Sequence, residues 1–344
     1  MTRIRASEAR ITRPDGVAPD AVVSVFRVPA EVAGQRVDVF LQNQLKRTSR
    51  TRAQEILRVS GYDGRGHRLR PSSRVQEGQT IVLWRAPWDE TPVPTVVPIV
   101  HEDEHLFAVN KPPHLPVHPT ARYHKNTLIK VLERARPDTF VSLGHRLDRE
   151  TSGVLLVSKS SACDRALKKR LEARDDIEKT YVAYTWGDPS TSEVAAGRDR
   201  FRYERSVELD PTSRTKVKMR LGVTDTALWA ATRFEVLERK RSSTGSVYTK
   251  VQCELETGRQ HQIRLHLAAL GTPIVGDKLY GPDEMLFARC ADGEMTEEDV
   301  RVLEMDRHAL HAWKLELRHP MTDEPLSITA PVPEDMQTFW NGIV

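Results

Sequence analysis

The sequence has few cysteines and no long hydrophobic run in its 344 residues. Its three cysteines, Cys163, Cys253 and Cys290, are odd in number and far apart, so neither a disulfide framework nor a cysteine-based zinc site is expected. The most apolar stretch, residues 93–100, is short and contains two prolines, which excludes a membrane-spanning helix. Residues 1–16 lack the apolar core of a secretory signal. These absences predict a cytoplasmic protein with no membrane association.

The sequence does contain enough apolar side chains, 39% of the total, to bury a core. Its net charge of +4 hides an uneven distribution. Residues 34–86 hold eleven Lys and Arg against four Asp and Glu, which gives +7, whereas residues 282–344 hold five against fourteen, which gives −9. A short segment at +7 favours contact with a polyanion such as nucleic acid. A solvated charged face is the alternative.

The composition also indicates where the chain divides into domains. Residues 87–98 contain four prolines, which is typical of a semi-extended linker. This linker separates an N-terminal extension (1–33) and a small domain (34–86) from a large domain (99–344). Within the small domain the apolar spacing predicts two helices and a strand, at residues 37–45, 50–59 and 80–84, and a further strand is expected at residues 21–28.

The large domain is interpreted as an α+β fold with the following elements. The expected strands are 106–109, 154–158, 180–186, 231–237, 251–256 and 312–317, and the expected helices are 126–135, 161–173 and 260–269. The acidic stretch 292–306 is interpreted as a surface insertion.

The basic side chains of the small domain cluster around the junction of its two helices, along the second helix and in the turns that follow. They are the candidate RNA contacts of this domain: Lys46, Arg47, Arg50, Arg52, Arg58, Arg68 and Arg74.

One short motif matches a zinc-protease signature. His101 and His105 frame the sequence HEDEH, but that chemistry needs both histidines on one face of a long helix. Here the motif runs into strand-like residues 106–109, so surface residues are expected rather than a metal site. A zinc hydrolase remains the alternative hypothesis.

The most informative segment is GHRLDRETSGVLLVSKS at residues 144–160. A charged turn containing Asp148 leads directly into the apolar residues 154–157, and a carboxylate at the mouth of a buried strand is held rigidly, as a nucleophile requires. Taken alone, such an Asp is more often a cap or a turn-former. The surrounding pattern is what favours a reactive role.

This pattern resembles the RluA-type pseudouridine synthases, whose hallmark is HRLD followed by TSG and a buried strand. The resemblance extends in family order over residues 100–335. It includes NKP at 110–112 with VHP at 117–119, the KxYxA strand at 179–183, and ETGRQHQIRLH at 256–266. Residues 34–84 are similar to the S-four type (αL) RNA-binding domain that precedes the catalytic domain in many of these enzymes.

The resemblance implies a fold and an activity. The fold is α+β, with a mixed, largely antiparallel central sheet, preceded by a small αL domain. The activity is isomerisation of specific uridines in ribosomal or transfer RNA to pseudouridine. Such an enzyme uses RNA as its partner and needs no metal or organic cofactor, and a monomer is expected. The rival hypothesis with the same charge distribution is a catalytically silent RNA-binding or ribosome-assembly factor.

The resemblance also implies residue roles. Asp148 is the essential carboxylate, and Arg264 is the cation expected beside it, with Arg259 as the alternative. Either arginine could instead contact a phosphate. Whether the carboxylate attacks the sugar or the base stays open.

The remaining site residues are assigned to flipping and holding the base. Arg146 matches the family arginine that helps to extrude the base, and Tyr181 matches the residue that stacks on it, with plain core packing as its alternative. Ile263 could wall the pocket or simply belong to a helix core. Lys111 is either structural or a phosphate contact. His114 stands where the family has glycine, so this loop is a departure from the pattern.

Overall fold

A computed structural model gives the fold of the chain. It describes residues 3–4, 6, 9–45, 48–120, 123–173, 176–215 and 217–344. The chain divides into two units, Met1–Glu90 and Thr91–Val344, and their boundary falls within the proline-containing stretch 87–98. Each unit has its own sheet and its own hydrophobic core. None of the described helices is long and apolar enough to cross a membrane.

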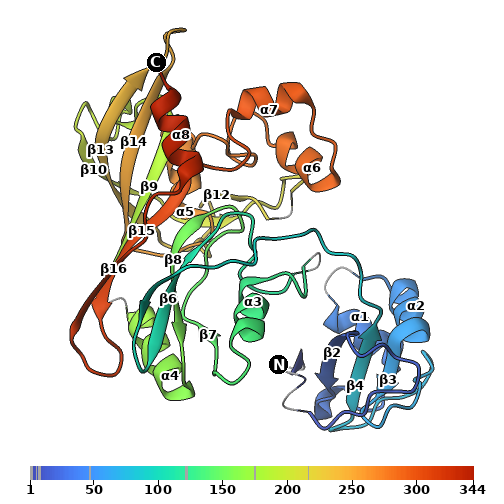
Figure 1. Cartoon of the computed structure of the whole chain (residues 1–344). Coiled ribbons are helices and arrows are strands. Elements are labelled where there is room, and N and C mark those ends of the chain that lie inside the picture. The colour runs from blue at the N-terminus through green and yellow to red at the C-terminus, as the bar shows by residue number, and fades with distance from the viewer. Residues whose placement is uncertain are drawn as a thin grey trace. The chain divides into compact units, whose positions relative to one another are not determined.

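The first unit packs two helices against a four-stranded antiparallel sheet in the order β1-β2-β4-β3 (Figure 1). Phe40 and Leu57 from the helices and Phe26 and Ile81 from the strands meet in its core. Ser49 caps the second helix, because its hydroxyl accepts the backbone N–H of Arg52 at 3.2 Å. The elements are β1 (Arg3–Ile4), β2 (Val22–Arg27), α1 (Val37–Gln44), α2 (Arg50–Ser60), β3 (Gly61–Asp63) and β4 (Thr80–Arg85).

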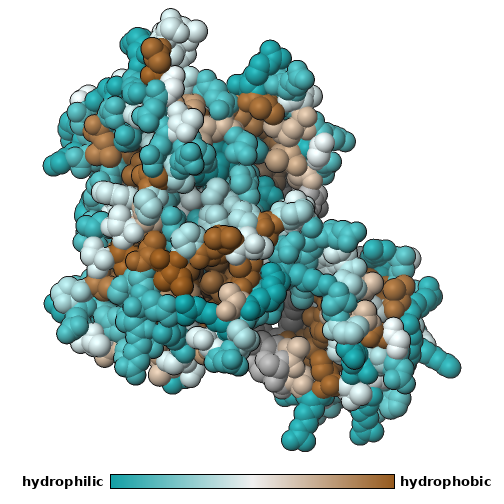
Figure 2. Space-filling view, in the orientation of Figure 1, coloured by the Kyte–Doolittle hydropathy of each residue, from teal (hydrophilic) through white to brown (hydrophobic). Residues whose placement is uncertain are grey.

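The strand at 22–27 lies inside this sheet, between β1 and β4. The sequence pattern predicts the strand but places it in an extension that ends at residue 33. Because Phe26 and Val28 are buried in the core of the unit, the structural unit begins before residue 34. Hydrophilic residues dominate the visible face of this unit (Figure 2).

The second unit is built on a mixed sheet whose main path runs β10-β13-β14-β9-β15-β8-β6-β5. All its pairs are antiparallel except that of β15 with β8, so the predicted α+β class with a mixed, largely antiparallel sheet is confirmed. Its strands are β5 (Ile99–Glu102), β6 (Leu106–Lys111), β7 (Ser142–Leu143), β8 (Ser152–Ser158), β9 (Ile177–Trp186), β10 (Arg200–Glu204), β13 (Ala231–Arg241), β14 (Val247–Leu255), β15 (Leu310–Arg318) and β16 (Pro325–Thr329), and β11 (Val207–Leu209) and β12 (Met219–Leu221) form a separate hairpin.

Helices cover both faces of this sheet. Along β6, Leu106 and Ala108 face a core that includes α4, while Phe107 and Val109 face a core that includes α3, α5 and α8. This alternation is what a period of two residues per strand produces. The helices are α3 (Leu128–Ala135), α4 (Ser161–Ala173), α5 (Gln262–Ala269), α6 (Met285–Asp292), α7 (Glu297–Leu303) and α8 (Glu334–Gly342).

The parallel pair β8–β15 is unusually close at its start. Gly153 pairs with Ala312 at a φ of +115°, and a Cβ atom at residue 153 would lie 2.1 Å from the carbonyl oxygen of Ala312. Only glycine fits at this point, which gives a physical reason for the Gly in the TSG sequence. The close pair brings the turn that precedes β8 against the segment that precedes β15.

Candidate active site

The second unit contains a pocket of about 180 Å³ in front of the turn between β7 and β8. Its wall combines side chains from this turn, from β9, from the start of α5 and from the segment that leads into that helix. It includes all but one of the residues that the sequence predicts for the large domain's site: Arg146, Asp148, Tyr181, Arg259, Ile263 and Arg264. The exception is Lys111.

Hydrogen bonds of two hydroxyl groups, those of Thr151 and Ser152, fix the end of the turn that carries Asp148. The Thr151 hydroxyl lies 2.8 Å from Nε2 of His308, and the Ser152 hydroxyl lies 2.9 Å from Nδ1 of His311. His308 lies in the segment that leads into β15, and His311 is the second residue of β15. With the close approach at Gly153, these bonds fix the start of β8 and therefore the position of Asp148.

Two buried cations hold the same turn through its backbone. Lys111 is fully buried, and its ammonium group donates to the carbonyl oxygens of Pro112, Leu115 and Arg149 at 2.8, 3.0 and 3.1 Å. Arg307 donates to the carbonyl oxygen of Glu150 at 3.2 Å. The ammonium of Lys111 therefore binds the backbone of the loop, which favours the structural role over the phosphate contact that the sequence leaves open.

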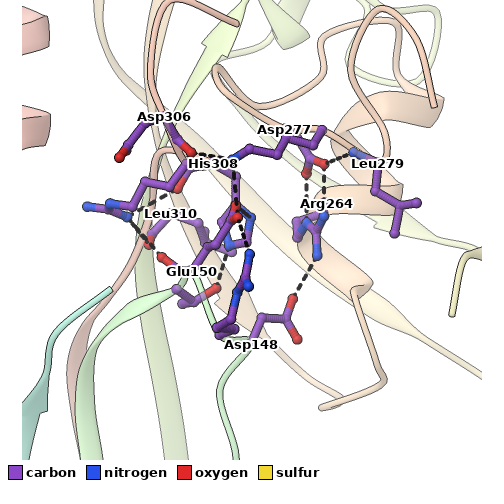
Figure 3. A network of polar contacts seen from close by, with 12 residues as sticks. Asp148, Glu150, Arg264, Asp277, Leu279, Asp306, His308 and Leu310 are labelled. Atoms are coloured by element: carbon purple, nitrogen blue, oxygen red, sulfur yellow. Dashed lines mark hydrogen bonds and ion pairs between the residues drawn. The ribbon is translucent and has the colours of Figure 1, made fainter. Parts of the chain in front are cut away.

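The partner of Asp148 is Arg264, as Figure 3 shows. Nη1 of Arg264 donates to Oδ2 of Asp148 at 3.0 Å, while Nε and Nη2 bind both carboxylate oxygens of Asp277 at 2.7 and 2.8 Å. Asp277 is 0% exposed and also accepts the backbone N–H groups of Leu279 and Tyr280. Asp277 thus orients the guanidinium, and the guanidinium orients Asp148.

This arrangement keeps Asp148 ionised. Burial disfavours a charged carboxylate, yet His261 and Arg264 together lower the pKa of Asp148 to about 2. Burial also lowers the pKa of His261 to about 4, so the imidazole is neutral near pH 7 and Arg264 is the cation that acts there. The pocket therefore presents a fixed carboxylate anion at neutral pH.

Part of the pocket wall is apolar. Tyr181 on β9 and Ile263 on α5 are buried and line the pocket. Burial, followed by the charge of Asp148, raises the pKa of Tyr181, so its phenol stays protonated near pH 7. A neutral aromatic ring on the pocket wall is suited to stacking on a flat ligand.

The two remaining arginines of the pocket differ in their surroundings. The guanidinium of Arg146 is exposed and makes no hydrogen bond or ion pair with any residue that the structure describes. Arg259 donates through Nε to the carbonyl oxygen of Trp229 at 3.1 Å, away from Asp148. Between the two arginines that the sequence offers as partners of Asp148, the structure places Arg264 beside the carboxylate.

The sequence assigns no role to three residues that complete this site. Asp277 holds Arg264, the His261 ring lies on the pocket wall, and the Tyr280 hydroxyl lies 2.9 Å from Nδ1 of His261. His261 stands within the motif at 256–266, and Asp277 and Tyr280 follow it. The available signal was the position of Asp277 just after the apolar residues 274–275. This position indicates a buried carboxylate, and a buried carboxylate requires a partner cation.

The basic side chains of the small unit are only partly available for a ligand. Arg50 pairs with buried Asp38 and Arg52 pairs with Glu55. Arg68 and Arg74 donate to the backbone carbonyl oxygens of Arg58 and Gly34, respectively. The guanidinium of Arg58 is exposed and has no partner among the described residues, and the predicted contacts Lys46 and Arg47 lie outside them.

The HEDEH sequence does not form a helix. His101 lies on β5, and His105 follows a turn before β6. The two side chains therefore lack the one-turn helical spacing of a zinc-protease site. No group of three or more His, Cys, Asp or Glu side chains among the described residues could hold a metal ion.

Comparison with known proteins extends this description. A family model described as RNA pseudouridylate synthase matches residues 105–269. The ribosomal large subunit pseudouridine synthase D of Xanthomonas campestris pv. campestris is 32% identical over 323 residues, which cover 92% of this chain and 91% of that protein. The protein of the same name in Xylella fastidiosa is 34% identical over 316 residues, covering 90% and 89%.

A solved structure shows the same fold. The human RNA pseudouridylate synthase domain containing 1 superposes with a TM-score of 0.54 at 24% identity, covering 70% of this chain and 86% of that one. At this identity the likeness concerns the fold alone.

Proposed function

Because the chain belongs to the RNA pseudouridylate synthase family, we propose that it acts on uridine in large-subunit ribosomal RNA and that Asp148 is the carboxylate that reacts. The chain is an RNA pseudouridine synthase, an isomerase. The choice of substrate is supported by the names of the two bacterial relatives, each of which matches about nine-tenths of the chain. The observation that carries the role of Asp148 is its contact with Arg264 inside the pocket.

The reaction breaks the bond between C1′ of the ribose and N1 of uracil, turns the base and joins C1′ to C5. The C5 proton is lost and N1 ends protonated, so no electrons enter or leave. A carboxylate can capture the intermediate, as in retaining glycosidases, only while it is ionised. The low pKa of Asp148 meets this requirement. Arg264 supplies the permanent countercharge, and Asp277 keeps that arginine in place.

The target base has to leave its stack to reach Asp148. Arg146 is proposed to assist this step, since its side chain is exposed at the pocket and makes no hydrogen bond or ion pair within the described parts of the chain. Tyr181 is proposed to stack on the extruded uracil, with Ile263 beside it on the pocket wall. An aromatic face gives stacking energy without fixing the in-plane orientation, so the base can rotate.

The stacking role predicts a clear order of variants at Tyr181. Tyr181→Phe keeps the ring and is expected to retain activity within about threefold, because the protonated phenol is not required. Tyr181→Leu loses a stacking contact worth about 1–3 kcal/mol, so kcat/KM should fall about five- to a hundredfold. Steady-state kinetics on the RNA substrate measure both effects. A Phe variant as impaired as the Leu variant would assign the phenol hydroxyl a direct part instead.

The small unit is proposed to be the S-four type RNA-binding domain. Its helices carry exposed basic side chains, and residues 34–86 carry a charge of +7. A phosphate contact releases condensed counterions, so its loss weakens binding most at low salt.

Arg58 is the sharpest test of this role, since its guanidinium has no partner in the described parts of the unit. Arg58→Gln is expected to weaken RNA binding and to lower the slope of log K against log salt concentration by about 1. Arg52→Gln is the matched control on the same helix, because Arg52 already pairs with Glu55. An unchanged slope for Arg58→Gln would remove this residue from the RNA contacts.

The substrate is tested by mapping pseudouridine in total RNA from strains with and without this protein. We expect one or more sites of large-subunit ribosomal RNA to lose the modification. Loss confined to transfer RNA would overturn the proposed substrate and leave the family and its reaction unchanged.

A further inference from the structure

His261 faces the reactive carboxylate from the pocket wall, and the reaction described above assigns it no role. Its Nε2 atom lies 3.9 Å from Oδ1 of Asp148. The residue precedes α5 with a φ of +56°, in the left-handed region. A non-glycine residue in that region costs conformational free energy, and such residues cluster at functional sites.

A hydrogen-bond chain fixes which nitrogen of His261 carries the proton. The hydroxyl of Tyr280 accepts the backbone N–H of Met219 at 2.8 Å and lies 2.9 Å from Nδ1 of His261. If Nδ1 donated to this hydroxyl, the buried phenol proton would have no acceptor among the described residues. Tyr280 therefore donates to Nδ1, and the neutral ring carries its proton on Nε2, the atom that faces Asp148.

The charges around the ring keep it neutral near pH 7. Burial lowers the pKa of His261 to about 4, although the charge of Asp148 opposes this shift. Arg264 and Arg146 also lower the pKa, and Asp277 raises it. Nε2–H is thus a neutral donor directed toward the pocket.

The two oxygens of Asp148 differ in their partners. Oδ2 accepts a hydrogen bond from Arg264, whereas Oδ1 accepts none from the residues that the structure describes. We propose that His261 is a positioning residue whose Nε2–H donates to Oδ1 of Asp148 when RNA fills the pocket, so that both carboxylate oxygens point in fixed directions. The proposal rests on the proposed role of Asp148. The present gap exceeds a hydrogen bond, and active-site hydrogen bonds commonly shorten in the substrate complex.

Three variants separate this role from a structural one. His261→Leu removes the donor, and kcat is expected to fall about ten- to a hundredfold with KM within about twofold, as for a lost hydrogen bond to a charged group. His261→Gln keeps an N–H at similar reach and should recover most of the loss. Tyr280→Phe removes the group that fixes the proton and should lie between them. Tyr203→Phe is the matched control, since Tyr203 is a buried residue whose hydroxyl bonds to no described residue.

The tautomer is measured independently of activity. Nitrogen-15 NMR of histidine-labelled protein without RNA should show Nδ1 unprotonated and Nε2 protonated in the wild type, and a mixture of tautomers in Tyr280→Phe. A proton on Nδ1 in the wild type overturns the hydrogen-bond chain.

The kinetic outcomes are equally decisive. A folded His261→Leu variant with unchanged kcat, or a Gln variant no better than Leu, overturns the positioning role. A wild type that forms no pseudouridine on any RNA overturns the proposed role of Asp148 instead. The two failures can be told apart because the NMR result does not depend on turnover.

Discussion

Replacing Asp148 with asparagine is expected to lower pseudouridine formation by at least about a thousandfold, the scale seen when a reacting group is removed. Asparagine keeps the size of the side chain but not its charge. Its amide cannot act as a nucleophile toward the sugar or the base, and one of the two oxygen positions becomes an NH₂ group. The Arg264 guanidinium, which now donates to Oδ2 at 3.0 Å, would then lack half of its countercharge.

The measurement is single-turnover conversion of uridine in the RNA substrate. Asp138→Asn is a matched control, because Asp138 is exposed and its carboxylate bonds to no described residue. RNA binding should be retained in Asp148→Asn within about threefold, since the phosphate contacts that dominate affinity lie elsewhere. Full activity in the Asn variant would contradict the proposed mechanism. A wild type and an Asn variant that both bind RNA and both leave uridine unchanged would favour a silent RNA-binding factor.

Much of the sheet could be predicted from local pattern. The strands at 154–158 and 180–186 are apolar runs of the right length, and both lie within observed strands, β8 and β9. The pattern is less clear for short edge elements. The hairpin β11–β12 and the helix α8 were not predicted, because their few buried residues, such as Val207 and Met336, show no sustained period.

The centre of the site was predictable because its residues stand in distinctive motifs. The pairing of Asp148 with Arg264 joins residues 116 positions apart, which no local pattern can indicate, so the resemblance supplied it. The contacts that hold these residues in place could not be predicted from the sequence in the same way. That Lys111 binds three carbonyl oxygens, and that Asp277 binds Arg264, depends on where loops meet in three dimensions.

Replacing Arg264 with glutamine is expected to lower the free energy of unfolding by about 3–5 kcal/mol, the range for breaking a buried ion pair from one side. The variant leaves Asp277, which is 0% exposed, without its bidentate partner. Arg259→Gln is the matched control, because Arg259 lies on the same pocket wall and donates to a backbone carbonyl rather than to Asp277. Chemical denaturation of both variants measures the difference. Equal losses of unfolding free energy in the two variants would contradict the role of Arg264 as the partner of buried Asp277.

The same variant changes the pH dependence in a defined direction. In the wild type the pKa of Asp148 is depressed to about 2, below its ordinary value of 3.8, so the ionised carboxylate stabilises the fold at neutral pH. This contribution is lost only as the pH falls through the ordinary value toward 2. Without Arg264, burial acts with less opposition and the pKa of Asp148 rises, so both the stability and the activity of Arg264→Gln should decline at a higher pH than in the wild type. Activity profiles between pH 4 and 8, taken where each protein is folded, test the shift. An acid limb at the same pH in both proteins would show that Arg264 does not control the charge of Asp148.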